Sequence, residues 1–272
     1  MVRQDLPLAM RLKEQAGWNQ TEADWLRHLD LEPNGCFVAE VEGTPCGTVC
    51  TCVFGPVAWI AMLLVDAPLR RRGVGAALVG RAMEYLDGRG IRSVRLDATA
   101  LGRPLYEKLG FEAQFELARF EGVPAPSSPI AGAMPPQPEE IDQILRLDRT
   151  ITATDRSRLL ARLFAEQPEG LRVARDSGRV AGYASARPGT SASQIGPCLG
   201  EAAAAELLLA DGLARYAGRR VYVDIPLINA PAVALASRRG LAEQRRLVRM
   251  CRGDLVQEDL VRFWASFGPE KG

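Results

Sequence analysis

The sequence predicts an α/β protein made of two similar units that a proline-rich linker joins. Two ungapped repeats are the main evidence. Val38–Gly47 aligns with Val173–Gly182, and both segments have the pattern of a strand, a glycine-containing turn and a second strand. Gly110–Arg119 aligns with Gly240–Arg249 near the end of each unit. A chain of 272 residues is long enough for two domains of ordinary size.

The segment between the repeats has the composition of an extended linker, because proline and glycine interrupt helices and strands. Its prolines are Pro124, Pro126, Pro129, Pro135, Pro136 and Pro138. We therefore expect one unit over residues 1–122, a linker over 123–139, a second unit over 140–253 and a tail over 254–272.

The first unit is predicted to open with helices. Leu6–Gln15 and Glu22–Leu29 have the apolar spacing of amphipathic helices, and the first begins too near the start for a full strand to precede it. Met62–Val65 ends an apolar run that predicts a strand, and Ser93–Asp97 predicts another. The Ala- and Leu-rich segment that follows Gly75 predicts the helix between them.

The second unit repeats this order. Ala202–Leu208 predicts a helix, and Val221–Asp224 corresponds to the strand of the first unit that ends at Asp97. The tail from Asp254 to Phe267 is predicted to form a helix that packs back on the body. The apolar residues behind this prediction are Leu255, Leu260, Phe263, Trp264 and Phe267.

The segment from Leu63 to Leu78 says most about function. A proline-marked loop ends the strand there, and a basic turn with two glycines opens the helix. The N-terminus of a helix presents free N–H groups and a partial positive charge, so it attracts phosphate groups. Gly73 and Gly75 let the backbone approach a ligand closely, and three arginines add cations. The pattern predicts a phosphate-binding loop.

This spacing, Arg-x-x-Gly-x-Gly, resembles the pyrophosphate loop of the GCN5-related N-acetyltransferases (GNAT). Pro104–Phe111 resembles the Leu-Tyr-x-x-x-Gly-Phe segment of the same superfamily, and the resemblance covers residues 5–120. It implies that each unit is a GNAT-like domain, with a mixed, mostly antiparallel twisted sheet flanked by helices. It also implies acetyl-CoA as the acyl-donor cosubstrate.

The resemblance assigns roles by position. The main chain of Leu63, Leu64 and Val65 would hold the pantetheine arm. Tyr106 would act as the general acid, because a phenol with a pKa of about 10 keeps its proton at neutral pH and can give it to a thiolate. The asparagine that usually precedes the tyrosine segment is missing from Ala98–Arg103. The residues expected at the pyrophosphate are Arg70, Arg71, Arg72, Gly73, Val74, Gly75 and Ala76.

The second unit lacks both motifs. Ile195–Glu201 runs directly into the helical pattern, with no counterpart of the arginine loop, and Glu201 would repel a pyrophosphate. Ala236 stands opposite Tyr106 in the repeat alignment. Asp155–Arg156 and Asp224–Pro226 resemble a degenerate C-terminal domain of some bacterial tandem acetyltransferases. We therefore expect only one active site.

The acceptor site and the general base are less defined. Trp18, Tyr183, Arg187 and Asp224 are candidates for an acceptor site between the halves, or are ordinary turn residues. An enclosed site there favours a small amine. Sequence leaves the base open among five residues, of which His28 is expected on the surface of its helix or at its cap. The five are Glu22, His28, Glu40, Asp66 and Asp97.

Composition excludes several other classes of protein. The formal net charge is +1, so no global field recruits nucleic acid or an anionic membrane. No apolar run reaches the roughly 18 residues of a membrane span. Six cysteines without a C-x-x-C pair, and a single histidine, indicate buried free thiols and no metal site. We expect a cytoplasmic monomer or homodimer.

The predicted function is acyl-CoA-dependent transfer of an acetyl group to the amine of a small molecule. Two alternatives stay open. One is a non-catalytic acyl-CoA-binding sensor or interaction module. The other is a protein or peptide N-acetyltransferase, which the near-neutral charge disfavours because basic peptides need an acidic channel.

Overall fold

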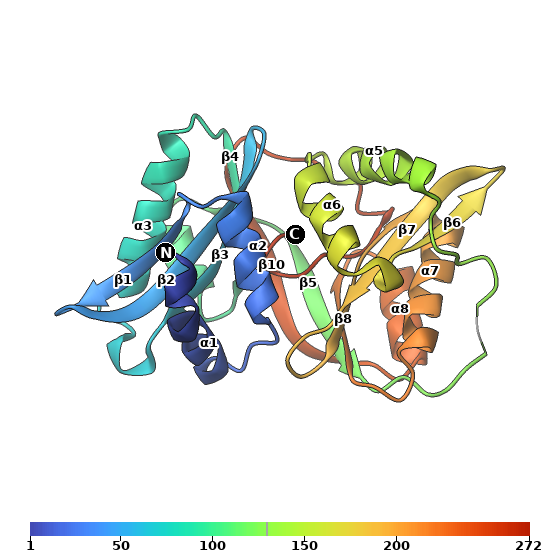
Figure 1. Ribbon diagram of the computed structural model, residues 1–272, viewed down its shortest axis with the longest axis horizontal. Coiled ribbons are helices and arrows are strands. Elements are labelled where there is room, and N and C mark those ends of the chain that lie inside the picture. Colours follow the sequence, from blue (N-terminus) through green and yellow to red (C-terminus); the bar gives the residue numbers. More distant parts are fainter. Residues whose placement is uncertain (129) are drawn as a thin grey trace.

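The computed structural model describes residues 1–128 and 130–272, and it places both halves of the chain on one continuous sheet (Figure 1). Neighbouring strands follow the order β1-β2-β3-β4-β10-β5-β9-β8-β7-β6, and β11 pairs with β8. Most pairs are antiparallel, and β3–β4 and β8–β9 are parallel. The predicted α/β class, with a mixed sheet flanked by helices, is confirmed.

The first half contains four α-helices and five strands in the described residues. They are α1 (Leu6–Gln15), α2 (Glu22–Leu31), β1 (Cys36–Val41), β2 (Thr44–Phe54), β3 (Val57–Val65), α3 (Val74–Asp87), β4 (Ser93–Thr99), α4 (Arg103–Lys108) and β5 (Glu112–Gly122). The two opening helices and the first hairpin lie where the sequence predicts them.

The second half follows the same plan. Its elements are α5 (Ile141–Thr152), α6 (Ser157–Glu166), β6 (Arg172–Asp176), β7 (Arg179–Arg187), β8 (Ser193–Gly200), α7 (Ala202–Arg215), β9 (Val221–Pro226), α8 (Ala230–Arg238), β10 (Ala242–Gly253) and β11 (Phe263–Ala265). In the linker, Met134 forms a single β-bridge with Val173.

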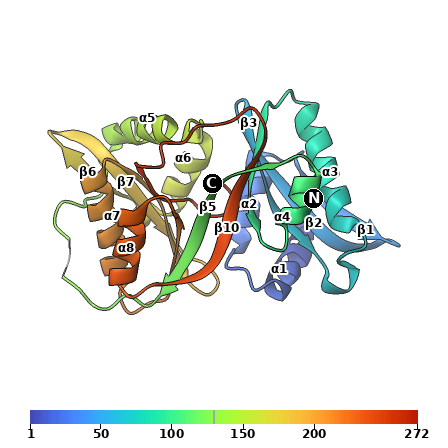
Figure 2. The same cartoon turned by 180° about the vertical axis from the view of Figure 1, so that it is seen from behind.

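The halves exchange their last long strands. Strand β10 of the second half lies between β4 and β5, and β5 of the first half lies between β10 and β9. Figure 2 shows these two strands crossing the middle of the molecule side by side. Each half therefore completes its sheet with a strand of the other, which the repeat pattern alone does not reveal.

The helices cover both faces of the sheet. On one face, α1 and α2 share a core with α5 and α6, in which Trp25, Trp59 and Leu159 are buried (Figure 1). On the other face α3 packs over Ile60 and Met250, and α7 and α8 pack in a separate core (Figure 2). All six cysteines are buried free thiols, as predicted.

The predicted helix in the tail is wrong. The segment forms the short strand β11, which lies antiparallel to β8, and Phe263, Trp264 and Phe267 are buried. The apolar spacing suits a helix, but the backbone groups of β8 next to this segment need hydrogen-bond partners. The Gly200 amide donates to the carbonyl of Arg262, and an extended segment supplies such partners where a helix does not.

Candidate active site

A cleft opens where β3 and β4 separate. The two strands pair in parallel only from Val57 to Trp59. Beyond that point a bulge interrupts β3 opposite β2, with Met62 in the left-handed region at φ 55°. A bulge re-aims the strand and leaves backbone groups unpaired. A cavity of about 420 Å³ lies between the separated strands, and Leu63, Leu64 and Val65 line it.

The predicted phosphate loop lies at one side of this cavity. Arg70 lines the cavity, and Arg70, Arg71 and Arg72 are exposed. Arg71 and Gly73 adopt left-handed conformations, with φ of 60° and 87°. No side chain caps α3 at Gly73, and the amides of residues 71–73 have no backbone acceptor in the described part of the chain. Such a loop presents N–H groups to an anion.

Tyr106 in α4 lines the same cavity. Its ring packs edge-on against Phe111, with the ring centroids 5.9 Å apart. Burial raises the pKa of Tyr106 to about 12, and among the described residues its hydroxyl has no hydrogen-bond partner. A neutral phenol in this position can donate a proton to a ligand. The structure thus brings β3, Arg70 of the arginine loop and Tyr106 to one cavity.

The four predicted acceptor residues do not converge. Trp18 lines the cavity, whereas Tyr183, Arg187 and Asp224 are buried with protein partners elsewhere. Tyr183 donates to Asp148, Arg187 binds Glu270 and the Phe267 carbonyl, and Asp224 binds Arg119. Buried charges need such partners, so these positions stabilise the fold.

The cavity also contains residues that sequence reasoning missed. These are Gln20 after α1, Arg245 and Leu247 on β10, and Pro269 and Glu270 near the end of the chain. No local motif marks them. Strand exchange and the extended tail bring the residues of β10 and of the chain end to the first half, whereas Gln20 lies in the connection between α1 and α2.

The general base stays open. Of the five candidates, only Asp97 lines the cavity. His28 is fully buried rather than at the surface, with its Nδ1 3.1 Å from the Cys52 Sγ. Burial and the Lys271 cation hold the pKa of His28 well below its usual range. Burial raises the pKa of Asp97, whose side chain is 0% exposed and bound to Arg249. Glu22, Glu40 and Asp66 do not line the cavity.

The second half has the same splayed strands, but its gap is filled. Strands β8 and β9 pair in parallel only from Ser193 to Ile195 and then separate. The chain's own β11 lies against β8 in this gap, and the Ser266 amide donates to the Asp224 carbonyl at 2.8 Å. The Asn229 side chain donates to the Phe263 carbonyl at 3.1 Å. The tail therefore occupies the place that corresponds to the open cleft.

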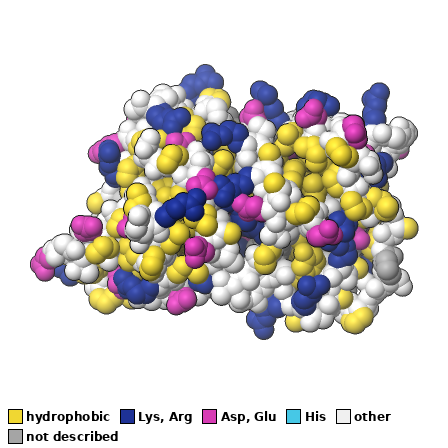
Figure 3. Space-filling model, viewed as in Figure 1, with side chains coloured by type: hydrophobic (Ala, Val, Ile, Leu, Met, Phe, Trp, Pro, Cys, Tyr) yellow, Lys and Arg dark blue, Asp and Glu magenta, His cyan; other side chains and the backbone are white. Residues whose placement is uncertain are grey.

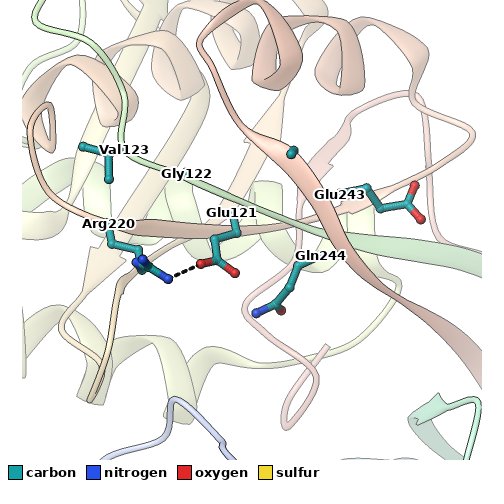
Figure 4. A pocket seen from close by; sticks show the side chains of 7 residues that line it. Glu121, Gly122, Val123, Arg220, Glu243 and Gln244 are labelled. Carbon is teal, nitrogen blue, oxygen red and sulfur yellow. Dashed lines mark hydrogen bonds and ion pairs between the residues drawn. The ribbon is translucent and has the colours of Figure 1, made fainter.

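A smaller cavity, of about 220 Å³, lies beside paired ends of β5 and β10, next to a bulge in β10 (Figure 4). Its charged groups already pair within the protein, since Glu121 binds Arg220 (Figure 4) and Glu243 binds Arg246. None of the predicted site residues lines it. Its chemistry adds nothing to the cleft between β3 and β4.

These features are those of a GNAT acetyltransferase fold with an open cleft between β3 and β4. The chain belongs to this family, since residues 3–111 match the acetyltransferase (GNAT) family and residues 144–265 match a second acetyltransferase (GNAT) domain. It is an N-acetyltransferase with two such domains in tandem.

Similar proteins agree with this assignment. The holothin acyltransferase of a Pseudoalteromonas strain is 26% identical, over 94% of this chain and 87% of its own length. The uncharacterized N-acetyltransferase YitH of Bacillus subtilis is 24% identical, over 80% of this chain and 77% of its own. A candidate acetyltransferase from Pyrococcus horikoshii has a similar crystal structure, with a TM-score of 0.85, 22% identity and coverage of 100% and 94% of the two chains.

Two further findings concern the surroundings of the protein. Within the described residues, no helix is both long and apolar enough to cross a membrane. On the face shown in Figure 3, acidic and basic side chains are interspersed, and side chains of both signs gather between the two halves.

Proposed function

We propose that the chain transfers the acetyl group of acetyl-CoA to the amine of a small molecule, at a single site in the first half. The observation that carries this proposal is the cavity of about 420 Å³ that Arg70, the separated end of β3 and Tyr106 share. It joins a phosphate-binding loop to a proton donor through a strand with free backbone groups.

The residues present fit acetyl-CoA. The amides of residues 71–76 and the three exposed arginines would bind the pyrophosphate, because α3 begins there without a side-chain cap. A Cβ atom added at Gly73 would meet nothing within 4 Å, so a ligand has room beside this turn. Leu63, Leu64 and Val65 would pair with the pantetheine arm through their backbone groups on the side toward β4, since β3 and β4 pair only from Val57 to Trp59.

The transfer needs one bond to form and one to break. The amine nitrogen attacks the thioester carbonyl, a C–N bond forms and the C–S bond breaks. The Tyr106 hydroxyl gives its proton to the departing sulfur, and the amine loses a proton to water. Burial favours the neutral phenol before the reaction, so the proton is available over the whole physiological pH range.

The walls of the cavity favour a small acceptor. The segment after α1, strand β10 and residues 269–270 all contribute to the wall of this cavity, whose volume of about 420 Å³ suits a small molecule. A protein tail would need an open groove instead. Six buried, unpaired thiols suit a reducing compartment, so we propose a cytoplasmic enzyme that works as a monomer or homodimer.

Calorimetric titration with acetyl-CoA tests this proposal. The wild type should bind one acetyl-CoA per chain, and the double variant Arg72→Glu/Gly73→Glu should lose binding. Arg158→Glu, which changes an exposed arginine of the second half, is the matched control and should bind normally. Two sites would contradict a single active site, and no binding would overturn the assignment of the cosubstrate. Binding without transfer to any amine would favour an acyl-CoA sensor.

A further inference from the structure

Arg245 reaches the candidate active site from the second half of the chain. Register along β10 is regular from Arg245 to Arg249, so these two residues and Leu247 face the same side of the sheet. Arg249 lies over the ring of Trp59, 4.7 Å from its centroid, in the core beneath α1 and α2. Val248 and Met250 point to the other face, beneath α3. Arg245 therefore enters the cavity on the α1–α2 side, away from Tyr106.

The other charged groups around this cavity already have protein partners. The Asp97 carboxylate accepts two hydrogen bonds from Arg249, at 2.8 and 2.9 Å. Glu270 accepts one hydrogen bond from Gln20 at 3.1 Å and another from Arg187. Arg70 donates through Nε to the carbonyl of Val65, in the phosphate loop.

Arg245 has no such partner among residues 1–128 and 130–272. Its Nε is buried without a hydrogen bond, and no carboxylate forms an ion pair with it. The nearby Asp224 is bound on both oxygens by Arg119. Burial, and then the Arg119 cation, lower the pKa of Arg245. Within the described residues, Arg245 is thus a cation of the cavity with neither an ion pair nor a hydrogen bond, and a buried polar group without a partner is costly unless a ligand satisfies it.

We propose that the acceptor is an amine that also carries a carboxylate, and that Arg245 binds this carboxylate. This inference rests on the proposed acetyl transfer and names its substrate class. The guanidinium group presents N–H donors in a planar fork that matches the two oxygens of a carboxylate. Glu270, which borders the same cavity, disfavours a doubly charged phosphate beside it. The cavity therefore suits a small amino acid-like molecule.

Matched pairs of acceptors test the proposal. Each of the common amino acids is compared with the amine that lacks its carboxylate, such as L-phenylalanine with 2-phenylethylamine and L-lysine with cadaverine. O-Phosphoethanolamine is compared with β-alanine. The rate at which the CoA thiol is released gives kcat/KM for each acceptor. We expect the carboxylated member of the best pair to be preferred at least about ten-fold, as a charge-assisted hydrogen bond allows.

Variants of Arg245 connect this preference to the side chain. Arg245→Gln should raise KM for the amino acid roughly 10- to 100-fold and leave its decarboxylated partner unchanged. Arg245→Glu should reverse the preference toward cadaverine. Arg246→Gln, which changes the exposed neighbour on the same strand, should change neither. Because a merely structural role would lower both members of a pair together, the ratio between them is the decisive readout.

Calorimetry with acetyl-CoA separates the two proposals. If the wild type does not bind acetyl-CoA, the proposed function fails. If it binds acetyl-CoA but acetylates no member of the panel, prefers the amines without a carboxylate, or prefers the phosphate, the inference about Arg245 is overturned. The same holds if Arg245→Gln retains the wild-type preference. Equal acetyl-CoA affinity in wild type and Arg245→Gln would show that the variant is folded.

Discussion

Arg249 in β10 donates two hydrogen bonds to the carboxylate of Asp97 in β4, and the side chains of both residues are 0% exposed. The pair joins the second half of the chain to the first. A reciprocal pair joins Arg119 in β5 to Asp224 in β9, with two bonds of 2.8 Å. Arg119 aligns with Arg249 in the repeat. The exchange of strands therefore places equivalent ion pairs on either side of the two central strands, β10 and β5.

Removing one member of this pair should destabilise the whole protein. Arg249→Met leaves the Asp97 carboxylate buried without its cation, and Glu258 keeps only its ion pair with Arg95, which typically costs about 3–5 kcal/mol in the free energy of unfolding. Urea denaturation followed by tryptophan fluorescence measures the loss. The control Arg246→Met changes an exposed arginine of the same strand and should have a much smaller effect. A similar loss in both variants would show that the buried pair is not the cause.

Strand exchange predicts that the two halves unfold together. Neither half has a complete sheet alone, because β10 separates β4 from β5 and β5 separates β10 from β9. Differential scanning calorimetry should therefore show one transition, whose calorimetric enthalpy equals the van't Hoff enthalpy. Two resolved transitions, or a folded fragment of residues 1–122 on its own, would contradict this prediction.

Local features of the fold could be predicted from the sequence, and long-range pairing could not. The hairpin around Gly43, the arginine loop and the tyrosine segment have local patterns, and the structure has these elements at the predicted places. The repeat alignment also equates Asp97 with Asp224. It does not say which arginine pairs with which aspartate, since the pattern of each strand is the same whether its partner lies in its own half or in the other.

The candidate site shows the same division. Several of the residues that the resemblance assigns to the acyl donor line one cavity, because they lie on consecutive elements of the first half. They are Leu63, Leu64, Val65, Arg70 and Tyr106, whereas residues 71–76 are not among its lining residues. Arg245, Pro269 and Glu270 come from segments far away in the sequence, and no motif marks them. Tyr183, Arg187 and Asp224 were plausible by residue type, but their charges and hydroxyl are already satisfied within the core.

Replacing Tyr106 by phenylalanine should slow the reaction without weakening the binding of acetyl-CoA. Loss of a general acid typically lowers kcat by roughly 10²- to 10⁴-fold. Stopped-flow or steady-state assays of thiol release measure kcat, and calorimetry measures the affinity. The neighbouring substitution Phe111→Leu, which removes only the packing ring, is the control. Full activity of Tyr106→Phe would exclude the assigned role.

Loss of the Tyr106 proton should not lower the kcat of the wild type in the moderately alkaline range. Burial raises the pKa of this phenol to about 12, so the neutral form persists above the pH at which an exposed tyrosine ionises. The proton is lost only as the pH rises through the raised value. A pH profile of kcat up to about pH 10, the usual tyrosine pKa, checks this. A basic limb near pH 8 that is absent in Tyr106→Phe would contradict it.

Asn229 should hold the tail in the gap of the second half. Its side chain donates to the carbonyl of Phe263 at 3.1 Å and accepts from the amide of Ala232 at the start of α8. Asn229→Ala removes both contacts and should cost about 1–3 kcal/mol, since a buried carbonyl then lacks its donor. Faster hydrogen exchange in residues 261–266 measures the loosening, with the exposed Ser237→Ala on α8 as control. Unchanged exchange in the tail would mean that β8 alone holds it.

We expect no second acetyl-CoA site to appear in Asn229→Ala, because β8 runs directly into α7 without an arginine loop and Glu201 lies at the start of that helix. A second binding site in this variant would mean that the tail alone prevents binding there.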